Sequence, residues 1–490
     1  TRYLCSFLLA IAFAAIAHGA PPNILVILVD DMGYGDVGSF NQDSKIATPH
    51  IDGLAQEGMR FRDAHAPGPL CHMSRYGLMT GEYPFRTDVT VWAKHPLITE
   101  NQMTIASLLK TQGYRTAMVG KWHLGFEENG YENPLPGGPI DRGFDTYFGI
   151  RASTDIPPYF YIRDNLAISP PTERIESRNS EGWTNIQGEF WREGGIAPGL
   201  ALKDVLPRFT NEAIAVIEDH SRDSKRSRDP LMLYLAYPAP HTPWLPSPEF
   251  RGKSGASMYG DFVMMVDAQI GRVLKALDKA DMTEDTLVVF TSDNGPVWYD
   301  QDVEKYGHDS SGGLRGMKSD AWEAGHRMPF IVRWPGEVKA GSRSDQLVCF
   351  TDLMATFADI NEVTLPRAAG PDSFSFLPAL KGKKPRKTPT RESVVMESGS
   401  GGLMTIRSGD WKFIEGQGSG GFSGRVRGGD PLAAGGSSKS ADTDEDGPEA
   451  QLYLLSEDIG ETTNLFDQNP EVVSQLRKEM AQIIKAVRSR

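Results

Sequence analysis

The chain has 490 residues, of which 39% are hydrophobic and 23% are charged. This length allows one large α/β domain together with a smaller one. The formal net charge of −13 argues against a nucleic-acid-binding protein, because such proteins normally carry a basic excess. It does not exclude an anionic substrate, since a local cationic pocket dominates the electrostatic field at short range.

An apolar run over residues 4–17 follows Arg2 and ends in Ala17-His18-Gly19. The run is too short to cross a bilayer and ends in a small-x-small pattern, so it predicts a secretory signal peptide over residues 1–19. The alternative is a buried N-terminal helix. No other run of the sequence is long enough to span a membrane, so we expect a secreted or periplasmic protein without a membrane span.

Cleavage of the signal peptide would remove Cys5 and leave Cys71 and Cys349. In an exported protein these two could form one disulfide. Cys349 lies in the apolar stretch Leu347-Val348-Cys349-Phe350, which favours a small buried hydrophobic side chain instead. Cys71 is then the odd thiol, as expected of a chemically modified residue.

Continuous runs rich in Val, Ile and Leu predict parallel strands that are covered on both faces. Five such runs cover residues 23–29, 116–120, 231–236, 286–292 and 330–332. Helical patterns alternate with them over residues 48–58, 104–112 and 259–277. This alternation predicts a large doubly wound, mostly parallel sheet flanked by helices, which we assign to residues 20–385. In such sheets ligands bind beyond the carboxyl ends of the strands.

The pattern changes after about residue 385, and short antiparallel strands are predicted. They cover residues 393–397, 403–407, 411–414 and 451–455, and a closing helix covers residues 470–487. A Gly/Ser/Asp-rich insert over residues 416–449 cannot bury a core and predicts a flexible loop. Residues 386–490 are therefore expected to form a smaller antiparallel-sheet plus helix subdomain.

Polar side chains follow two of the predicted strands. Asp30 and Asp31 come after the first strand, and Asp293 and Asn294 come after the strand over residues 286–292. Three carboxylates brought together without a cation would be costly, and oxygen ligands suit Ca²⁺ or Mg²⁺ rather than Zn²⁺. The alternative is that these acidic residues cap helices, but two strand ends with the same character favour a metal site.

The block Cys71-His72-Met73-Ser74-Arg75 follows the turn at Pro69-Leu70. Its spacing places Cys71 and Arg75 on one face of a short helix, with the cysteine at the helix N-terminus. The block resembles the Cys-x-Pro-Ser-Arg signature of the sulfatase family, the formylglycine-dependent type I enzymes that include the arylsulfatases and belong to the alkaline phosphatase superfamily. It departs at Met73, where the family usually has proline or sometimes alanine.

Three further blocks resemble the same family, in the family's order, so the resemblance covers almost the whole mature chain. They are Gly120-Lys121-Trp122-His123-Leu124-Gly125, then Ala239-Pro240-His241-Thr242-Pro243, and then residues 314–318 with 323–329. A lone lysine or histidine would more often be a solvated or structural residue. Because several blocks occur in the family's order, a chance resemblance is an unsatisfactory explanation.

The resemblance implies that a maturation enzyme oxidises Cys71 to formylglycine. The hydrated side chain would then attack sulfur and form a covalent sulfo-enzyme. The implied cofactor is Ca²⁺, with Mg²⁺ as the alternative, held by Asp30, Asp31, Asp293, Asn294 and the side chain at position 71.

The resemblance also assigns the cationic residues. Arg75 and Lys121 would hold the diol, and Lys121 and Lys318 would clamp the sulfate oxygens. His241, with Lys318, would protonate the leaving alcohol, and His123 would assist expulsion of sulfate. These residue types suit the reaction, because negative charge develops on the leaving oxygen when the S–O bond breaks, and fixed cations and a metal stabilise it.

Three substrate-binding candidates rest on position in the sequence alone. His308 lies on the loop that carries Lys318 and could touch substrate or simply be solvated. Arg315 could bind a second anionic group or pair with a carboxylate. Trp298 could stack on a sugar ring, although burial in the core is the commoner fate of tryptophan.

The leading hypothesis is a secreted, calcium-dependent sulfatase that hydrolyses a sulfated small molecule or polysaccharide. The aromatic loops and the long irregular segment over residues 151–199 favour a carbohydrate. A phosphonate or phosphodiester hydrolase of the same superfamily is an alternative, but the pairing of Lys121 and His123 with Lys318 argues against it. A third hypothesis is a metal- and sulfate-ester-binding protein without turnover, if Met73, which lacks the fixed φ of proline, prevents maturation of Cys71.

Overall fold

The computed structural model describes residues 21–89, 94–223, 229–382, 391–399, 402–424, 443–444 and 446–490. The predicted signal peptide, residues 1–19, lies outside the described residues. Among the helices of the described ranges, none combines the length and apolar character needed to cross a membrane.

The centre of the molecule is a mostly parallel sheet, which has ten strands in the described part of the chain. Strands β11, β1, β10, β4 and β5 run parallel to one another in that order. The order across the sheet is β13 (Ser342–Ser344), β2 (Met59–Phe61), β12 (Phe330–Arg333), β11 (Thr286–Ser292), β1 (Asn23–Asp30), β10 (Leu231–Pro240), β4 (Arg115–Lys121), β5 (Thr146–Ile150), β6 (Ile162–Arg163) and β7 (Leu166–Ala167). The doubly wound α/β fold predicted from the sequence is confirmed.

One predicted strand runs in the opposite direction to the expectation. β12 pairs antiparallel with β11, with Ile331 opposite Phe290, and antiparallel with β2. The chain that leaves β11 stays at the carboxyl end of the sheet through α6 (Asp300–Tyr306) and α7 (Glu323–His326). Because no crossover returns it to the other end, it must re-enter the sheet in the reverse direction.

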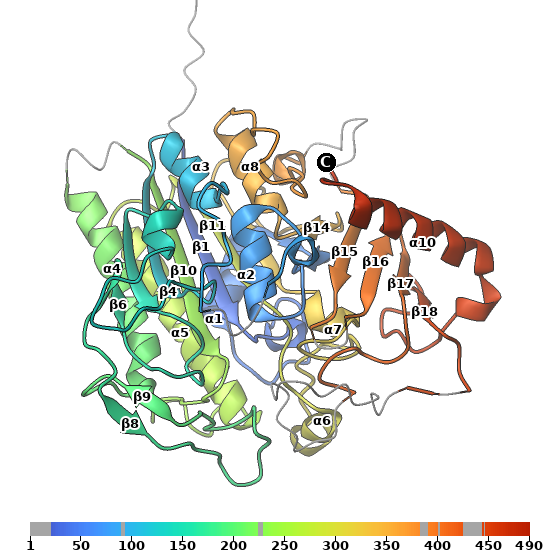
Figure 1. Cartoon of the computed structure of the whole chain (residues 1–490), viewed down its shortest axis with the longest axis horizontal. Helices are drawn as coiled ribbons and strands as arrows, with labels where there is room; N and C mark the ends of the chain where they lie inside the picture. Colours follow the sequence, from blue (N-terminus) through green and yellow to red (C-terminus); the bar gives the residue numbers. More distant parts are fainter. Residues whose placement is uncertain are drawn as a thin grey trace, which may run out of the picture.

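Helices cover both faces of this sheet (Figure 1). One face packs against α2 (Cys71–Thr80), α3 (Ile105–Thr111) and α8 (Asp352–Ile360), and the other against α1 (Pro49–Glu57), α4 (Val205–Arg222) and α5 (Ser257–Lys279). Along β1, Val26 and Leu28 face the first group, whereas Ile27 and Val29 face the second. A strand buried on both faces explains why its sequence is a continuous apolar run.

The C-terminal subdomain is a four-stranded antiparallel sheet under one helix, as predicted. Its strands lie in the order β15 (Ser393–Glu397), β16 (Met404–Ser408), β17 (Trp411–Ile414) and β18 (Gln451–Leu454), and α10 (Pro470–Lys485) packs on them through Leu476 and Met480. Figure 1 shows it beside the main sheet, in orange and red. Smaller elements are β3 (Ala64–His65), β14 (Val348–Cys349), β8 (Glu173–Ile175), β9 (Gly194–Ile196) and α9 (Leu377–Leu380).

The two cysteines of the described residues are not bonded to each other, and both are buried. Cys349 lies in β14 with 1% of its surface exposed and packs with Val394 and Met396. It therefore behaves as the small buried hydrophobic residue that its neighbours in the sequence predicted.

Candidate active site

The predicted site residues meet at the carboxyl ends of the central strands. Asp30 ends β1, Lys121 ends β4, and the chain continues from them into Asp31 and His123. The remaining contributions come from the segments after β10 and β11 and from the start of α2, which supply His241, Asp293, Asn294 and Cys71. Parallel strands place their carboxyl ends on one edge of the sheet, which brings these distant segments together.

Local backbone geometry turns the acidic side chains into the site. Asp31 has φ of 64°, in the left-handed region that few residues other than glycine adopt. The conformation is held from both sides, since Tyr259 Oη donates to the Asp31 carbonyl at 3.1 Å and the next amide, that of Met32, donates to Ser292 Oγ at 2.9 Å. The turn after β1 is therefore fixed by contacts with α5 and β11.

Helix α2 is buried along its whole length. It begins at Cys71, where the Ser74 amide donates to the Leu70 carbonyl at 2.9 Å, and it ends at Gly81, which has φ of 67°. A Cβ at Gly77 would come within 2.4 Å of Pro67 Cγ, so glycine is needed where the helix crosses the preceding segment. This close packing fixes the helix N-terminus, and with it the position of Cys71.

Two cations neutralise the carboxylates of Asp30 and Asp293. Lys121 Nζ lies 2.5 Å from Asp30 Oδ2, and Arg75 Nη2 lies 3.2 Å from Asp30 Oδ2 and 2.8 Å from Asp293 Oδ2. Burial alone would raise the pKa of the Asp30 carboxyl, but Lys121 and Arg75 hold it well below its usual value. Burial and the neighbouring Asp30 charge raise the pKa of Asp293 to about 6.

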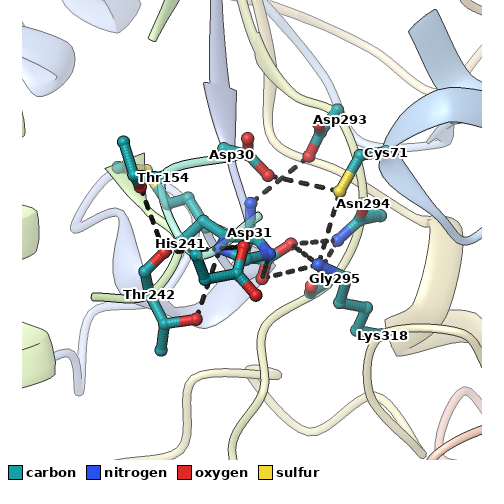
Figure 2. Close-up of polar contacts among 12 residues, drawn as sticks. Asp30, Asp31, Cys71, Thr154, His241, Thr242, Asp293, Asn294, Gly295 and Lys318 are labelled. Carbon is teal, nitrogen blue, oxygen red and sulfur yellow. Dashed lines mark hydrogen bonds and ion pairs between the residues drawn. The ribbon is translucent and has the colours of Figure 1, made fainter. Parts of the chain in front are cut away.

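A third cation lies between Asp31 and Cys71. Lys318 Nζ donates to both Asp31 oxygens, at 2.6 and 2.8 Å, and to Cys71 Sγ at 3.3 Å. Figure 2 shows the cysteine sulfur with Lys318 on one side and Asp30 on the other, where Sγ donates to Asp30 Oδ1 at 3.4 Å. Burial alone would lower the pKa of Lys318, but the Asp31 charge raises it above its usual value, so the ammonium group stays charged.

The unmodified thiol of Cys71 is not activated. Burial and then the Asp30 charge raise its pKa far above the usual value, although a helix N-terminus and Lys121 act in the opposite direction. The side chain at this position is thus a neutral thiol at neutral pH. Nucleophilic chemistry at position 71 requires a different functional group there.

The oxygen atoms of the site fit a hard divalent cation. One ligand atom from each of Asp30, Asp31, Cys71 and His241 lies within 4.8 Å of the others. Asn294 Oδ1 is buried and accepts no hydrogen bond from the described residues, while its Nδ2 donates to Asp31 Oδ1 at 2.6 Å. An unpaired buried amide oxygen beside three carboxylates matches the ligand set that Ca²⁺ and Mg²⁺ prefer.

The two histidines of the site differ in their surroundings. His241 Nδ1 lies 2.8 Å from the carbonyl of Thr242, to which it donates when it carries the proton, and Nε2 faces Asp31 Oδ2 at 3.6 Å. His123 is 5% exposed, and burial together with Lys121 lowers its pKa well below the usual value. His123 is therefore neutral at neutral pH.

A narrow pocket opens onto Cys71. Besides the predicted residues Asp31, Cys71, His123, His241 and Lys318, its walls contain polar and apolar residues that the sequence did not single out for this site. The polar ones are His72, Ser153, Asp155 and Thr242, and the apolar ones are Leu70, Ile156, Ile186, Val297 and Phe422. Leu70, His72 and Thr242 lie in or next to the motif blocks around Cys71 and His241. The other wall residues belong to segments without a recognisable motif, where the one available signal was an aromatic residue, Phe422, inside a Gly/Ser-rich stretch.

Phe422 lies in the insert that was predicted to be flexible. The structure describes residues 416–424, 443–444 and 446–449 of that insert. Phe422 is 3% exposed, and its neighbour Ser423 donates to Asp320 through Oγ at 2.6 Å and through its amide at 3.1 Å. The C-terminal subdomain thus reaches the pocket through this first part of the insert.

The three substrate-binding candidates lie outside this pocket. His308 is 1% exposed and lies 2.9 Å from Asp36, while Trp298 is 3% exposed and packs among other aromatic rings. Arg315 stacks on the ring of Trp322 at 3.7 Å and donates to the Glu461 carbonyl at 2.7 Å. All three have hydrogen bonds or packing contacts within the fold and none lines this pocket, and contact with substrate stays a prediction for them.

Met73, the departure from the family signature, is part of the apolar wall. It is 7% exposed and packs in a cluster with Leu70, Ile186, Val297, Met317 and Phe422. The position is therefore filled by a well-packed apolar side chain.

Comparisons with known proteins agree with this geometry. The profile of the family described as "Sulfatase" matches residues 22–362. The chain is 33% identical to an N-acetylgalactosamine-6-O-sulfatase of Bacteroides thetaiotaomicron, over 96% of this chain and 93% of that protein. It is 32% identical to human arylsulfatase A, over 98% of this chain and 90% of that protein.

Solved structures show the same relationship. A Bacteroides thetaiotaomicron protein, from work on the metabolism of multiple glycosaminoglycans, superposes with a TM-score of 0.80 at 30% identity, covering 96% of this chain and 100% of that chain. Ps i-CgsB, solved in complex with k-i-k-neocarrahexaose, superposes with a TM-score of 0.68 at 25% identity, covering 95% of this chain and 93% of that chain. The chain belongs to the sulfatase family, the sulfuric ester hydrolases.

Proposed function

We propose that this sulfatase removes sulfate from a saccharide and that Cys71 is its nucleophile after conversion to formylglycine. The observation that carries the proposal is the position of Cys71 at the base of the pocket, between Asp30 and Lys318. The relatives named for N-acetylgalactosamine 6-sulfate make that sugar the first substrate to test. Export from the cytoplasm, by the signal peptide that the sequence predicts, is part of the same proposal.

The metal would be held by Asp30, Asp31, Asp293, Asn294 and position 71, with Ca²⁺ as the expected ion and Mg²⁺ as the alternative. When bound, the ion supplies positive charge that stabilises negative charge on the reacting oxygens. Arg75 remains paired with Asp293 and Asp30, which keeps their oxygens directed into the site. The formylglycine, in its hydrated form, supplies the hydroxyl nucleophile that an unactivated thiol cannot.

The cations bind and orient the sulfate group. Lys121 and Lys318 pair with Asp30 and Asp31, the consecutive acidic residues at the end of β1, and their ammonium groups compensate the negative charge of an entering sulfate ester. His241 Nε2 faces the site and is the group that gives a proton to the leaving alcohol as the S–O bond breaks. His123, neutral because it is buried beside Lys121, takes up the proton released at position 71 when sulfate departs.

The test is mass spectrometry of the peptide that spans Cys71, from protein produced in its own host, together with release of sulfate from N-acetylgalactosamine 6-sulfate. We expect the mass deficit of an aldehyde in place of the thiol, and turnover that is lost after chelation of the metal. An intact, alkylatable thiol without turnover would overturn the proposal.

The second candidate function is a binding protein without turnover, and the observation that favours it is Met73 in place of the family's proline. The variant Met73→Pro distinguishes this function from hydrolysis. Among the described residues nothing accepts a hydrogen bond from the Met73 amide, because the Pro69 carbonyl accepts from Ser319 instead, so the first turn of α2 can hold a proline there. If the wild type keeps its thiol and Met73→Pro converts it, Met73 is the block and the binding function is favoured. Conversion in both proteins favours the hydrolase.

A further inference from the structure

Ser153, Thr154 and Asp155 form a short polar wall of the pocket, outside the residues of the sulfatase motifs. Ser153 and Asp155 line the pocket itself and are 3% and 2% exposed. Thr154 lies just behind them, where Figure 2 shows it beside Thr242 and His241. This wall therefore adjoins the histidine that faces the leaving group.

The wall is rigid. Asp155 Oδ2 accepts from Arg192 Nη1 at 2.5 Å, and Thr154 Oγ1 donates to the carbonyl of Thr242 at 3.2 Å. On the other side of Ser153, Arg151 pairs with Glu128 at 2.7 Å. These contacts attach the wall to three separate segments, so its side chains are already positioned before a substrate enters.

Asp155 has one carboxylate oxygen to which the described residues donate no hydrogen bond. Its Oδ1 is buried and accepts no hydrogen bond from the described residues, and Ser153 Oγ is in the same condition. His241 Nδ1 lies 3.8 Å from this oxygen, beyond hydrogen-bond distance, and 2.8 Å from the Thr242 carbonyl. A buried acceptor without a donor is costly, and here a ligand that brings a donor into the pocket removes that cost.

The ionised sulfate group carries only acceptors, so a donor that the substrate supplies to this oxygen belongs to its organic part. Because Asp155 lies beside His241, this donor is a few bonds from the ester oxygen that His241 protonates. We propose that Asp155, assisted by Ser153, binds a ring hydroxyl of the saccharide close to its sulfated carbon. The inference rests on the proposed function and makes Asp155 a specificity-determining residue.

The experiment measures binding without turnover, in a Cys71→Ser background with Ca²⁺ present. Calorimetry gives Kd for N-acetylgalactosamine 6-sulfate and for analogues in which one ring hydroxyl is replaced by hydrogen. We expect one analogue to bind about 10- to 100-fold more weakly, the range typical of a lost hydrogen bond to a charged group. In Asp155→Asn the parent sugar and that analogue should bind with Kd values within about threefold of each other, because the charged acceptor has been removed.

Glu128→Gln is the matched control, because it disturbs the same wall through Arg151 without facing the pocket, and it should keep the discrimination. The inference is overturned if no analogue binds more weakly, if Asp155→Asn discriminates as strongly as its parent, or if the sugar does not bind. Ser153→Ala should reduce the ratio of the two Kd values, those of the analogue and of the parent sugar, without abolishing it. This second variant still tests the inference if Asp155→Asn does not fold. Failure of the proposed function is distinguishable, since it appears as an unconverted Cys71 without turnover in the wild type.

Discussion

The two histidines of the site, His241 and His123, lie in different surroundings. His241 is partly accessible, with 11% of its side chain exposed, and presents Nε2 to the site, whereas His123 is buried beside Lys121 and held neutral. In the proposed reaction His241 delivers a proton to the leaving alcohol and His123 receives one, and these two roles suit their different environments. Two histidines at strand ends can therefore take different roles.

Replacement of His241 should depend on the leaving group. His241→Gln should lower kcat/KM about 100- to 10,000-fold for a sugar sulfate, whose alkoxide leaves poorly without a proton. With 4-nitrophenyl sulfate the loss should be much smaller, because the phenolate leaves without protonation. Rates on both esters check this, with the exposed His95→Gln as control. Equal losses on the two esters would contradict a role in protonation.

The loop that carries Lys318 and the loop that carries Phe422 are joined by hydrogen bonds, and the walls of the pocket depend on this connection. Asp320 is fully buried and accepts from the Met317 amide at 2.8 Å and from Ser423 Oγ at 2.6 Å. One carboxylate thus fixes the loop that carries Lys318 and the loop that carries Phe422. The rigidity of the pocket is a property of this pairing of loops.

Asp320→Ala should therefore lower kcat/KM for the saccharide by at least about tenfold, because Lys318 and Phe422 lose their common support. The free energy of unfolding should fall by about 1–3 kcal/mol, as several buried hydrogen bonds lose their acceptor. Ser423→Ala, which removes only the hydroxyl contact, is the control and should have a smaller effect on both. Steady-state kinetics and urea unfolding measure the two quantities, and full activity in a folded Asp320→Ala protein would contradict the argument.

At the scale of the whole molecule, buried charges join the C-terminal subdomain to the α/β domain. Lys412 of β17 lies 3.1 Å from Glu323 and 2.8 Å from Glu461, and all three side chains are fully buried. The Glu323 carboxylate also belongs to a cluster with His65 and His326 whose spacing would suit a metal ion. Lys412 Nζ, 3.2 Å from His326 Nε2, already supplies the cation there, so this cluster serves the interface.

Asp63 extends the same interface and gives it a pH dependence. Its carboxylate lies 2.8 Å from His65 Nε2, 3.4 Å from Arg327 and 3.3 Å from Arg407 of β16. Burial alone would raise the pKa of Asp63, but the hydrogen bond from His65 and the charge of Arg327 lower it to about 2. The pKa is thus lower in the folded state than in the unfolded state.

A lowered pKa means that the ionised carboxylate stabilises the fold above about pH 4 and that this contribution is lost as the pH falls from about 4 to 2. Asp63→Asn should reduce the free energy of unfolding by about 2 kcal/mol at pH 7, and the difference from wild type should shrink below about pH 4. Urea unfolding at several pH values measures it, with the exposed Asp410→Asn as control. A difference that stays constant down to the lowest accessible pH would count against this linkage.

Local patterns in the sequence predicted the elements and most of the residues that meet at the candidate site. Apolar runs on β1, β4, β10 and β11 showed burial on both faces, and residues at their carboxyl ends had to meet because parallel strands share one edge. The helices over residues 48–58 and 104–112 could be predicted from their capping residues, and the structure places them at Pro49–Glu57 and Ile105–Thr111. These features depend on local patterns, which a sequence displays directly.

Only the tertiary structure decided the direction of β12 and the walls of the pocket. Both depend on where long loops return, and that is set by contacts between segments far apart in the chain, such as Asp155 with Arg192 or Ser423 with Asp320. His308, Arg315 and Trp298 likewise have hydrogen-bond partners within the fold that no local pattern in the sequence indicates. The polar residues at the strand ends can therefore be predicted from the sequence. The residues that line the pocket cannot, because their positions depend on how the loops pack.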